Sequence, residues 1–167
     1  MIFVTVGTHE QPFNRLVKHL DNLVMDGKIM EEVFIQTGYS TYIPKHCEWS
    51  RFLPYREMED KVSCARIVIT HGGPASFIMP LQLGKIPVVV PRQEKFGEHV
   101  NDHQLDFCRE VEKRLGNIIL VEDMGMLERT VLCYETRTKK IKNEMENHNR
   151  DFVHQLDKLV NRMYANR

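Results

Sequence analysis

The chain has 167 residues, with 23 Lys and Arg balanced by 23 Asp and Glu, so its formal net charge is zero. This length suits one domain with a sizeable core, and the balanced charge predicts no nucleic-acid partner and no global attraction to an anionic bilayer. The apolar amino terminus is only strand-length and lacks a basic segment, so neither a signal peptide nor a membrane span is expected. The four cysteines show no C-x-x-C spacing, which favours reduced thiols in a cytosolic protein over disulfides or zinc.

Strands and helices alternate in the first third of the chain. Residues 2–6 form an apolar run that predicts a buried strand, and a helix opened by Pro12 and ended by Gly27 follows. Residues 32–36 predict a second strand and 48–52 a short third one, whereas 54–64 predict a short helix.

Residues 66–92 carry the strongest local signals. A β-branched run up to Thr70 predicts a buried parallel strand, which ends in the glycines of His71-Gly72-Gly73-Pro74. Pro74 predicts the entry to a helix that Gly84 stops, and residues 86–90 predict the next strand. Such a strand-to-helix junction presents free N–H groups and a positive helix end to an anion. It is therefore either a phosphate cradle or a tight connection without a ligand.

The remaining chain predicts a polar loop, a helix, a short strand at 118–121 and a helical tail from about Met126, with a break near 147–149. Apolar positions at helical intervals predict the inner face of the helix before Gly116: Val100, the Gln104 stem, Phe107, Val111 and Leu115. Pro80 inside the earlier helix predicts a kink.

Alternating strands and helices predict an α/β fold, with a Rossmann-like parallel sheet covered by helices on both faces and a single domain over residues 1–167. Ligands in open parallel sheets bind at the carboxyl ends of the strands. The polar residues that follow those ends are therefore expected to line one crevice: Gly7, Thr8, His9, Thr37, Gly38, His71, Gly72, Gly73, Ser76, Arg92 and residues 98–104.

The motifs narrow the chemistry of that crevice. The chain lacks G-x-x-x-x-G-K-[ST], H-E-x-x-H, G-x-S-x-G and a G-x-G-x-x-G after the first strand, which disfavours P-loop, zincin, hydrolase and dinucleotide enzymes. Backbone N–H groups, hydroxyls, histidines and one arginine suit a diphosphate. The group Glu98, His99, Asp102, His103 and Gln104 has the hydrogen-bonding mix that sugar hydroxyls need. Holding a diphosphate leaving group with N–H donors would be electrostatic catalysis without a metal.

Four segments in this order resemble the donor-binding half of GT-B glycosyltransferases of family 28, which includes the peptidoglycan lipid-intermediate GlcNAc transferase. They are residues 4–8 (VTVGT), 70–76 (THGGPAS), 84–92 (GKIPVVVPR) and 97–104 (GEHVNDHQ). The chain is most similar to stand-alone catalytic subunits, namely the soluble half of the split dolichol-linked GlcNAc transferase and bacterial polysaccharide-biosynthesis subunits of the PssE type.

The resemblance implies a role for each segment: Gly7 and Thr8 approach the diphosphate or sugar, Tyr55 and Met58 lie near the uracil, Gly72 to Ser76 hold the phosphates, and Asp102, His103 and Gln104 bind the hexose. It also implies inverting transfer, without a metal or cofactor, from a UDP-sugar to a diphospholipid-linked saccharide acceptor in exopolysaccharide or capsule biosynthesis. UDP-galactose is the favoured donor, with UDP-GlcNAc or UDP-glucose next.

A GT-B site lies between two Rossmann halves, and this chain holds one. A membrane-anchored partner subunit carrying the acceptor half is therefore expected, with this chain peripheral at the cytoplasmic face of the plasma membrane; a homo-oligomer is a further alternative.

Family members usually carry Glu where this chain has Met79, so either the ribose is held otherwise or nucleotide binding is weakened. A non-catalytic nucleotide-sugar-binding or stabilising subunit is the alternative function.

Several single residues keep two interpretations. His9 is either the general base or a donor contact. His71 either fixes its loop or contacts the ligand, and Arg92 either neutralises the diphosphate or pairs with Glu94 or Glu98. Glu98 and His99 either bind the sugar or only brace their loop.

Overall fold

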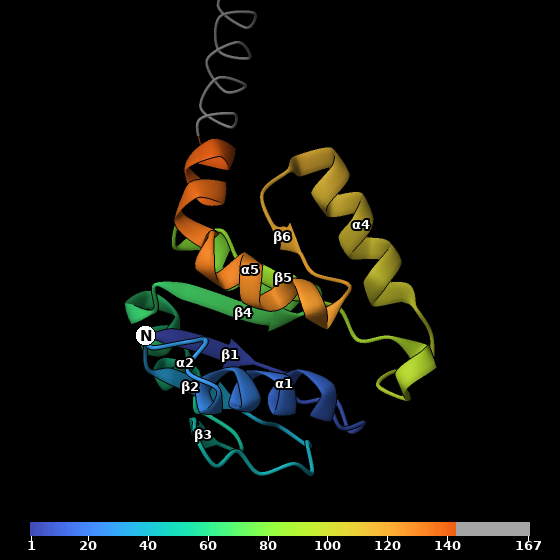
Figure 1. The fold of residues 1–167 in the computed structure, drawn as a ribbon. Helices are drawn as coiled ribbons and strands as arrows, with labels where there is room; N and C mark the ends of the chain where they lie inside the picture. Colours follow the sequence, from blue (N-terminus) through green and yellow to red (C-terminus); the bar gives the residue numbers. More distant parts are fainter. Residues whose placement is uncertain (143–167) are drawn as a thin grey trace, which may run out of the picture. The chain divides into compact units, whose positions relative to one another are not determined.

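The computed structural model describes residues 1–142, in which Met1–Leu132 form one compact unit and the chain from Cys133 onward belongs to a second. The first unit is built on a parallel sheet of six strands in the order β3-β2-β1-β4-β5-β6 (Figure 1). The strands are β1 (Ile2–Thr5), β2 (Val33–Gln36), β3 (Glu48–Ser50), β4 (Ile67–His71), β5 (Val88–Val90) and β6 (Ile119–Leu120). The predicted Rossmann-like parallel sheet is confirmed.

The central strands end in step at one edge of the sheet. Thr5 at the end of β1 pairs with Gln36 at the end of β2 and with Thr70 in β4. All four residues of β1 and the first four of β4 are buried, which is why their sequences are continuous apolar runs rather than alternating ones. This register brings the loops that follow β1 and β4 together at the carboxyl edge.

Helices connect the strands and cover the sheet. They are α1 (Asn14–Met25), α2 (Tyr55–Cys64), α3 (Pro74–Gln82), α4 (His103–Leu115) and α5 (Leu127–Leu132), with 3-10 turns η1 (Glu94–Phe96) and η2 (Met124–Met126). In Figure 1, α1 and α5 lie on the near side of the sheet and α2 lies behind it. Pro74 opens α3 and Gly84, with a φ of 70°, follows its end, as the sequence predicts. Within residues 1–142, no helix combines the length and apolarity that crossing a bilayer would need.

Helix α1 anchors the segment between β2 and β3 through polar side chains. Asn14 accepts hydrogen bonds from the backbone N–H groups of Thr41 and Tyr42, each at 2.9 Å. Asp21, which is fully buried, accepts from three consecutive N–H groups at residues 45–47 and from the Tyr42 hydroxyl. Burial raises the pKa of Asp21, but these hydrogen bonds outweigh it and lower the pKa to about 2.

The predicted inner face of the fourth helix is confirmed only in part, since Val111 packs against the core. Val100 precedes α4 and is 70% exposed, and Phe107 and Leu115 are also exposed, whereas Leu105 and Cys108 are buried. The face is turned by about one residue because Cys108 packs among Phe77, Val89 and Ile118. Phe107 instead stacks on Phe77, with ring centroids 6.1 Å apart.

The helical tail has an interruption at Cys133 that the sequence did not predict. Helix α5 ends at Leu132, Cys133 is a turn, and residues 134–142 are helical again. The predicted break near 147–149 lies outside the described residues.

Candidate functional site

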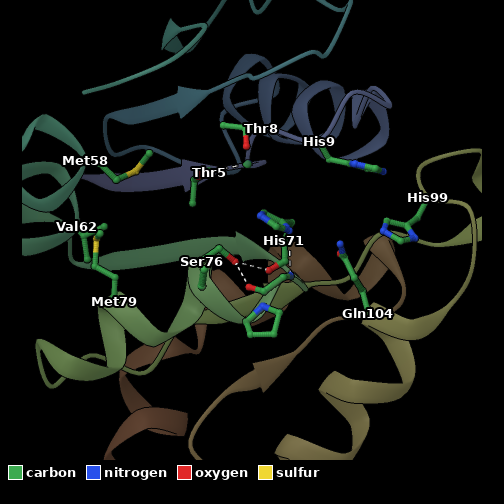
Figure 2. Close-up of a pocket in the computed structure, with 14 residues that line it drawn as sticks. Thr5, Thr8, His9, Met58, Val62, His71, Ser76, Met79, His99 and Gln104 are labelled. Atoms are coloured by element: carbon green, nitrogen blue, oxygen red, sulfur yellow. Dashed lines mark hydrogen bonds between the residues drawn. The ribbon is translucent and has the colours of Figure 1, made fainter. Parts of the chain in front are cut away.

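A cavity of about 580 Å³ opens at the carboxyl ends of β1 and β4 (Figure 2). This volume lies within the range typical of small-molecule sites, roughly 300–1,000 Å³. Of the residues predicted from the sequence, the cavity is lined by Gly7, Thr8, His9, Met58, His71, Gly73, Ser76, His99 and Gln104. The cavity is also lined by Thr5, Val62, Pro74, Ala75 and Met79. Pro74 and Ala75 lie within the segment Gly72 to Ser76 that was expected to hold the phosphates, and Met79 was noted as a departure from the family pattern. Thr5 and Val62 were not predicted for this site.

The two ends of the cavity differ in chemistry. Figure 2 shows Met58, Val62 and Met79 at one end and His9, His99 and Gln104 at the other, with His71 and Ser76 between them. We call these the methionine end and the histidine end. At the histidine end the rings of His9 and His99 lie 4.7 Å apart, and His9 Nε2 is 2.9 Å from Gln11 Oε1. One elongated ligand could therefore meet an apolar wall and a hydrogen-bonding wall at once.

His71 lies between two glycines that approach its ring closely. A Cβ atom on Gly7 would lie 2.3 Å from His71 Nε2, and one on Gly73 would lie 2.3 Å from His71 Cε1. The N–H of Gly73 also donates to His71 Nδ1 at 3.0 Å, which leaves the proton of a neutral ring on Nε2. His71 therefore joins the loop after β1 to the loop after β4.

The electrostatic surroundings keep His71 neutral. Burial is the main cause that lowers its pKa to about 4, and the Arg92 guanidinium, His9 and His99 act in the same direction, against a hydrogen bond with Gln104. At neutral pH this side chain is an uncharged hydrogen-bonding group. It is suited to fix a loop rather than to supply a positive charge.

Helix α3 begins at the middle of the cavity wall. Its N-cap residue, Gly73, offers no side-chain cap, and Pro74 at the first helical position has no N–H. Ala75 lines the cavity, and its N–H lacks an intrahelical acceptor because it lies in the first turn. Ser76 donates its hydroxyl to the carbonyl oxygens of Gly73, at 2.6 Å, and His71, at 2.9 Å. The positive end of the helix thus faces the cavity without a carboxylate to neutralise it.

Arg92 lies outside the cavity lining and is fully buried. It donates from Nη1 to the carbonyl oxygens of Gln11, at 2.7 Å, and Glu98, at 3.1 Å, and from Nη2 to that of Val6, at 2.8 Å. Burial lowers its pKa to about 10, so it stays charged at neutral pH. The predicted contact of Arg92 with a diphosphate has no support in this arrangement, because its guanidinium is bonded to three carbonyl oxygens in two loops, those after β1 and β5.

Glu98 is likewise buried and pairs with an arginine that the sequence did not single out. Arg15 of α1 holds both carboxylate oxygens of Glu98 at 2.8 Å. Pairing of Glu98 with the Arg92 guanidinium through its carboxylate, one of the expected alternatives, is therefore not observed. Glu98 braces the loop that carries His99.

Six other predicted site residues are not among those that line the cavity: Thr37, Gly38, Tyr55, Gly72, Asp102 and His103. Tyr55 is 69% exposed, and Gly72 is buried against Pro91, Gln104 and Cys108. Asp102 accepts a hydrogen bond from the Glu94 N–H at 2.8 Å, so it orders the η1 loop.

A second, smaller cavity of about 350 Å³ is lined by Arg15, His19, Lys95, Phe96, Glu122, Asp123 and Met124. It contains none of the predicted site residues. In the described part of the chain, no three His, Cys, Asp or Glu side chains gather as a metal site requires.

Comparison with known proteins gives a family and a fold. The family model described as "Glycosyltransferase family 28 C-terminal domain" matches residues 1–156. The glycosyltransferase SnogD from Streptomyces nogalater is 19% identical with a TM-score of 0.53, over 87% of this chain and 39% of that chain. The glycotransferase of kitacinnamycin is 16% identical with a TM-score of 0.49, over 88% of this chain and 39% of that chain. A search of curated proteins finds no significant match.

The chain thus spans about two fifths of the length of these two structures. Its sheet corresponds to one Rossmann-like half of a GT-B fold, as the sequence predicts. Because the family model covers most of the chain, the protein belongs to the glycosyltransferase family 28 C-terminal domain family.

Proposed function

We propose that this chain is the donor-binding half of an inverting glycosyltransferase and holds a UDP-sugar in the 580 Å³ cavity. The observation that carries the proposal is the order of the walls along one cavity: an apolar end, a helix start, and a hydrogen-bonding end. A nucleotide sugar has the same order of parts, namely a flat base with its ribose, a diphosphate, and a polyhydroxylated sugar. The uridine lies at the methionine end and the hexose at the histidine end.

The start of α3 receives the diphosphate. The exposed first turn directs the N–H of Ala75 and the positive helix end at the cavity, and Gly73 lets the ligand approach the backbone. Negative charge grows on the diphosphate as the bond to the hexose breaks, so donors fixed in advance at that point stabilise the transition state. His71 acts as the loop-fixing residue of this cradle, because its ring is bonded to Gly73 and enclosed by Gly7.

The histidine end receives the hexose. Gln104 lines this end and is held by a hydrogen bond of 3.3 Å from the Arg92 N–H to its Oε1, which leaves its amide NH₂ as a donor for a sugar hydroxyl. His9 and His99 offer ring nitrogens beside it. UDP-galactose is the favoured donor, with UDP-GlcNAc or UDP-glucose as alternatives.

The acceptor is a diphospholipid-linked saccharide of surface polysaccharide biosynthesis, bound by a membrane-anchored partner that supplies the other half of the cleft. SnogD is matched over 39% of its chain, and in this proposal the remainder of such a GT-B fold comes from the partner. In this proposal His9, which lines the cavity, acts as the general base that removes the proton of the attacking acceptor hydroxyl. The hydroxyl oxygen forms the new bond to the anomeric carbon while UDP leaves from the opposite face.

A screen of radiolabelled UDP-sugars tests this function. The purified chain should bind UDP in a calorimetric titration, and membranes that contain the co-expressed partner should transfer one hexose to lipid only when the chain is added. Binding of UDP without transfer from any UDP-sugar would favour the non-catalytic alternative. Full transfer by the purified chain without a partner would contradict the divided site.

A further inference from the structure

Gln11 lies in the loop after β1, two residues beyond His9, and its side chain bonds to the His9 ring. Its Oε1 atom is 2.9 Å from His9 Nε2, the one hydrogen bond that the described residues give to His9. An amide oxygen can only accept, so the ring nitrogen donates and a neutral His9 carries its proton on Nε2. The lone pair of the ring is then on Nδ1.

The backbone of Gln11 is fixed independently of its side chain. Arg92 donates from Nη1 to the Gln11 carbonyl oxygen at 2.7 Å and from Nη2 to that of Val6 at 2.8 Å, so one guanidinium holds both ends of the segment that contains His9. Arg92 is fully buried, and its Cζ lies 4.8 Å from the centroid of the Phe13 ring. The Gln11 side chain therefore extends towards His9 from a fixed point.

The loop after β5 limits His9 from a second direction. The His99 ring lies 4.7 Å from the His9 ring between centroids, and both line the histidine end (Figure 2). Glu98, which precedes His99, is held through its carboxylate by Arg15 and through its carbonyl oxygen by Arg92. Arg92 thus joins the loop that carries His9 to the loop that carries His99.

We propose that Gln11 is a positioning residue, which keeps the proton of His9 on Nε2 so that Nδ1 takes the proton of the attacking acceptor hydroxyl. The inference rests on the function proposed above, in which His9 is the general base. When Nδ1 accepts that proton, the ring becomes an imidazolium with an N–H at both nitrogens. Gln11 Oε1 then accepts from a charged donor, which is a stronger hydrogen bond than the one to the neutral ring. Gln11 does not line the cavity, so it acts through His9 alone.

Nitrogen-15 magnetic resonance of the histidine rings in the free chain tests the tautomer without donor or acceptor. At about pH 8, where an imidazole is neutral, His9 should show a resolved proton on Nε2. Gln11→Leu removes the acceptor but keeps the carbonyl that Arg92 holds, and should lose this signal to solvent exchange. His71, whose Nδ1 accepts from the Gly73 N–H, should be the same in both chains. A His9 proton on Nδ1 in the unmodified chain would overturn the inference and leave the donor-binding function intact.

Transfer kinetics with membranes and partner give a second readout. Gln11→Leu should lower kcat by about tenfold or more and leave the KM for the UDP-sugar and the Kd of UDP within about threefold. Gln11→Glu keeps an acceptor beside His9 and should recover most of the lost rate, and Gln82→Leu on the exposed end of α3 is the matched control. An unchanged kcat in Gln11→Leu would overturn the inference. Absence of transfer by the unmodified chain from every UDP-sugar would instead overturn the proposed function.

Discussion

Replacement of Gly73 by alanine tests the close packing at the centre of the site. The φ of Gly73 is −74°, which any residue adopts, so the effect of the change is purely steric. The added Cβ would lie 2.3 Å from His71 Cε1 and 2.9 Å from Nδ1. The ring cannot retreat freely, because Gly7 closes its other side and the Gly73 N–H is bonded to it.

The magnitude follows from two losses. Forcing a group into a packed site costs about 1–3 kcal/mol. Losing the bond to His71 Nδ1 costs about 1 kcal/mol. We therefore expect Gly73→Ala to lower the free energy of unfolding by about 2–4 kcal/mol in urea titrations. UDP affinity should fall by tenfold or more, because the cradle at the start of α3 shifts.

Two further variants separate this cause from general damage. Gly84 has a φ of 70° but no atom within 4 Å of its ideal Cβ, so Gly84→Ala should lower stability through backbone strain and leave UDP affinity unchanged. Removing the ring in a Gly73→Ala, His71→Ala double variant should cost less stability than the sum of the single changes. Wild-type stability and affinity in Gly73→Ala would refute the packing argument.

Three other outcomes follow from the described contacts. Gln104→Ala should reduce the rate of hexose transfer, measured with membranes and partner, by about tenfold or more. Gln82→Ala, on the exposed end of α3, is the control and should leave the rate unchanged. Equal transfer rates for the two variants would contradict a contact between Gln104 and the sugar. Asp21→Asn should lower the free energy of unfolding by about 2 kcal/mol at neutral pH. The stabilisation from the depressed pKa of Asp21 is present above pH 3.8 and is lost as the pH falls towards 2. A urea midpoint equal to that of the wild type would contradict this. Because the pKa of His71 is depressed from 6.5 to about 4, the free energy of unfolding should fall as the pH falls from 6.5 to 4. His71→Gln should make the free energy of unfolding depend less on pH in this range. An unchanged pH dependence would contradict a buried neutral ring.

The strands and the start of α3 could be predicted because their signals are local. β1 and β4 are buried on both faces, which requires uninterrupted apolar runs, and these are visible in the sequence. Pro74 and Gly84 mark the two ends of α3 through backbone constraints that need no partner. The cavity position followed from the same reasoning, because parallel strands deliver their following loops to one edge.

The role of Arg92 could not be predicted because it depends on distant backbone. Its partners are carbonyl oxygens at Val6 and Gln11, more than eighty residues earlier in the chain. Glu98 likewise pairs with Arg15, which lies 83 residues away. No local pattern reports such pairs, so a buried structural arginine and a ligand-binding arginine look the same in the sequence.

Part of the inner face of α4 and the apolar cavity residue Val62 were missed for a different reason. Phe107 is apolar but stacks at the surface on Phe77, whereas Cys108 takes the buried position, so the apolar pattern pointed to the neighbouring face. Val62 carries no polar group, and an apolar residue on a helix predicts core packing whether or not a cavity lies beside it.

Nuclear magnetic resonance titration of the chain with UDP-galactose tests the central claim most directly, by showing which residues sense the ligand. We expect chemical-shift changes at the amides of Ala75 and Ser76, the side-chain amide of Gln104 and the methyl groups of Met58 and Met79. Changes confined to the second cavity, around residues 15–19 and 122–124, would contradict it.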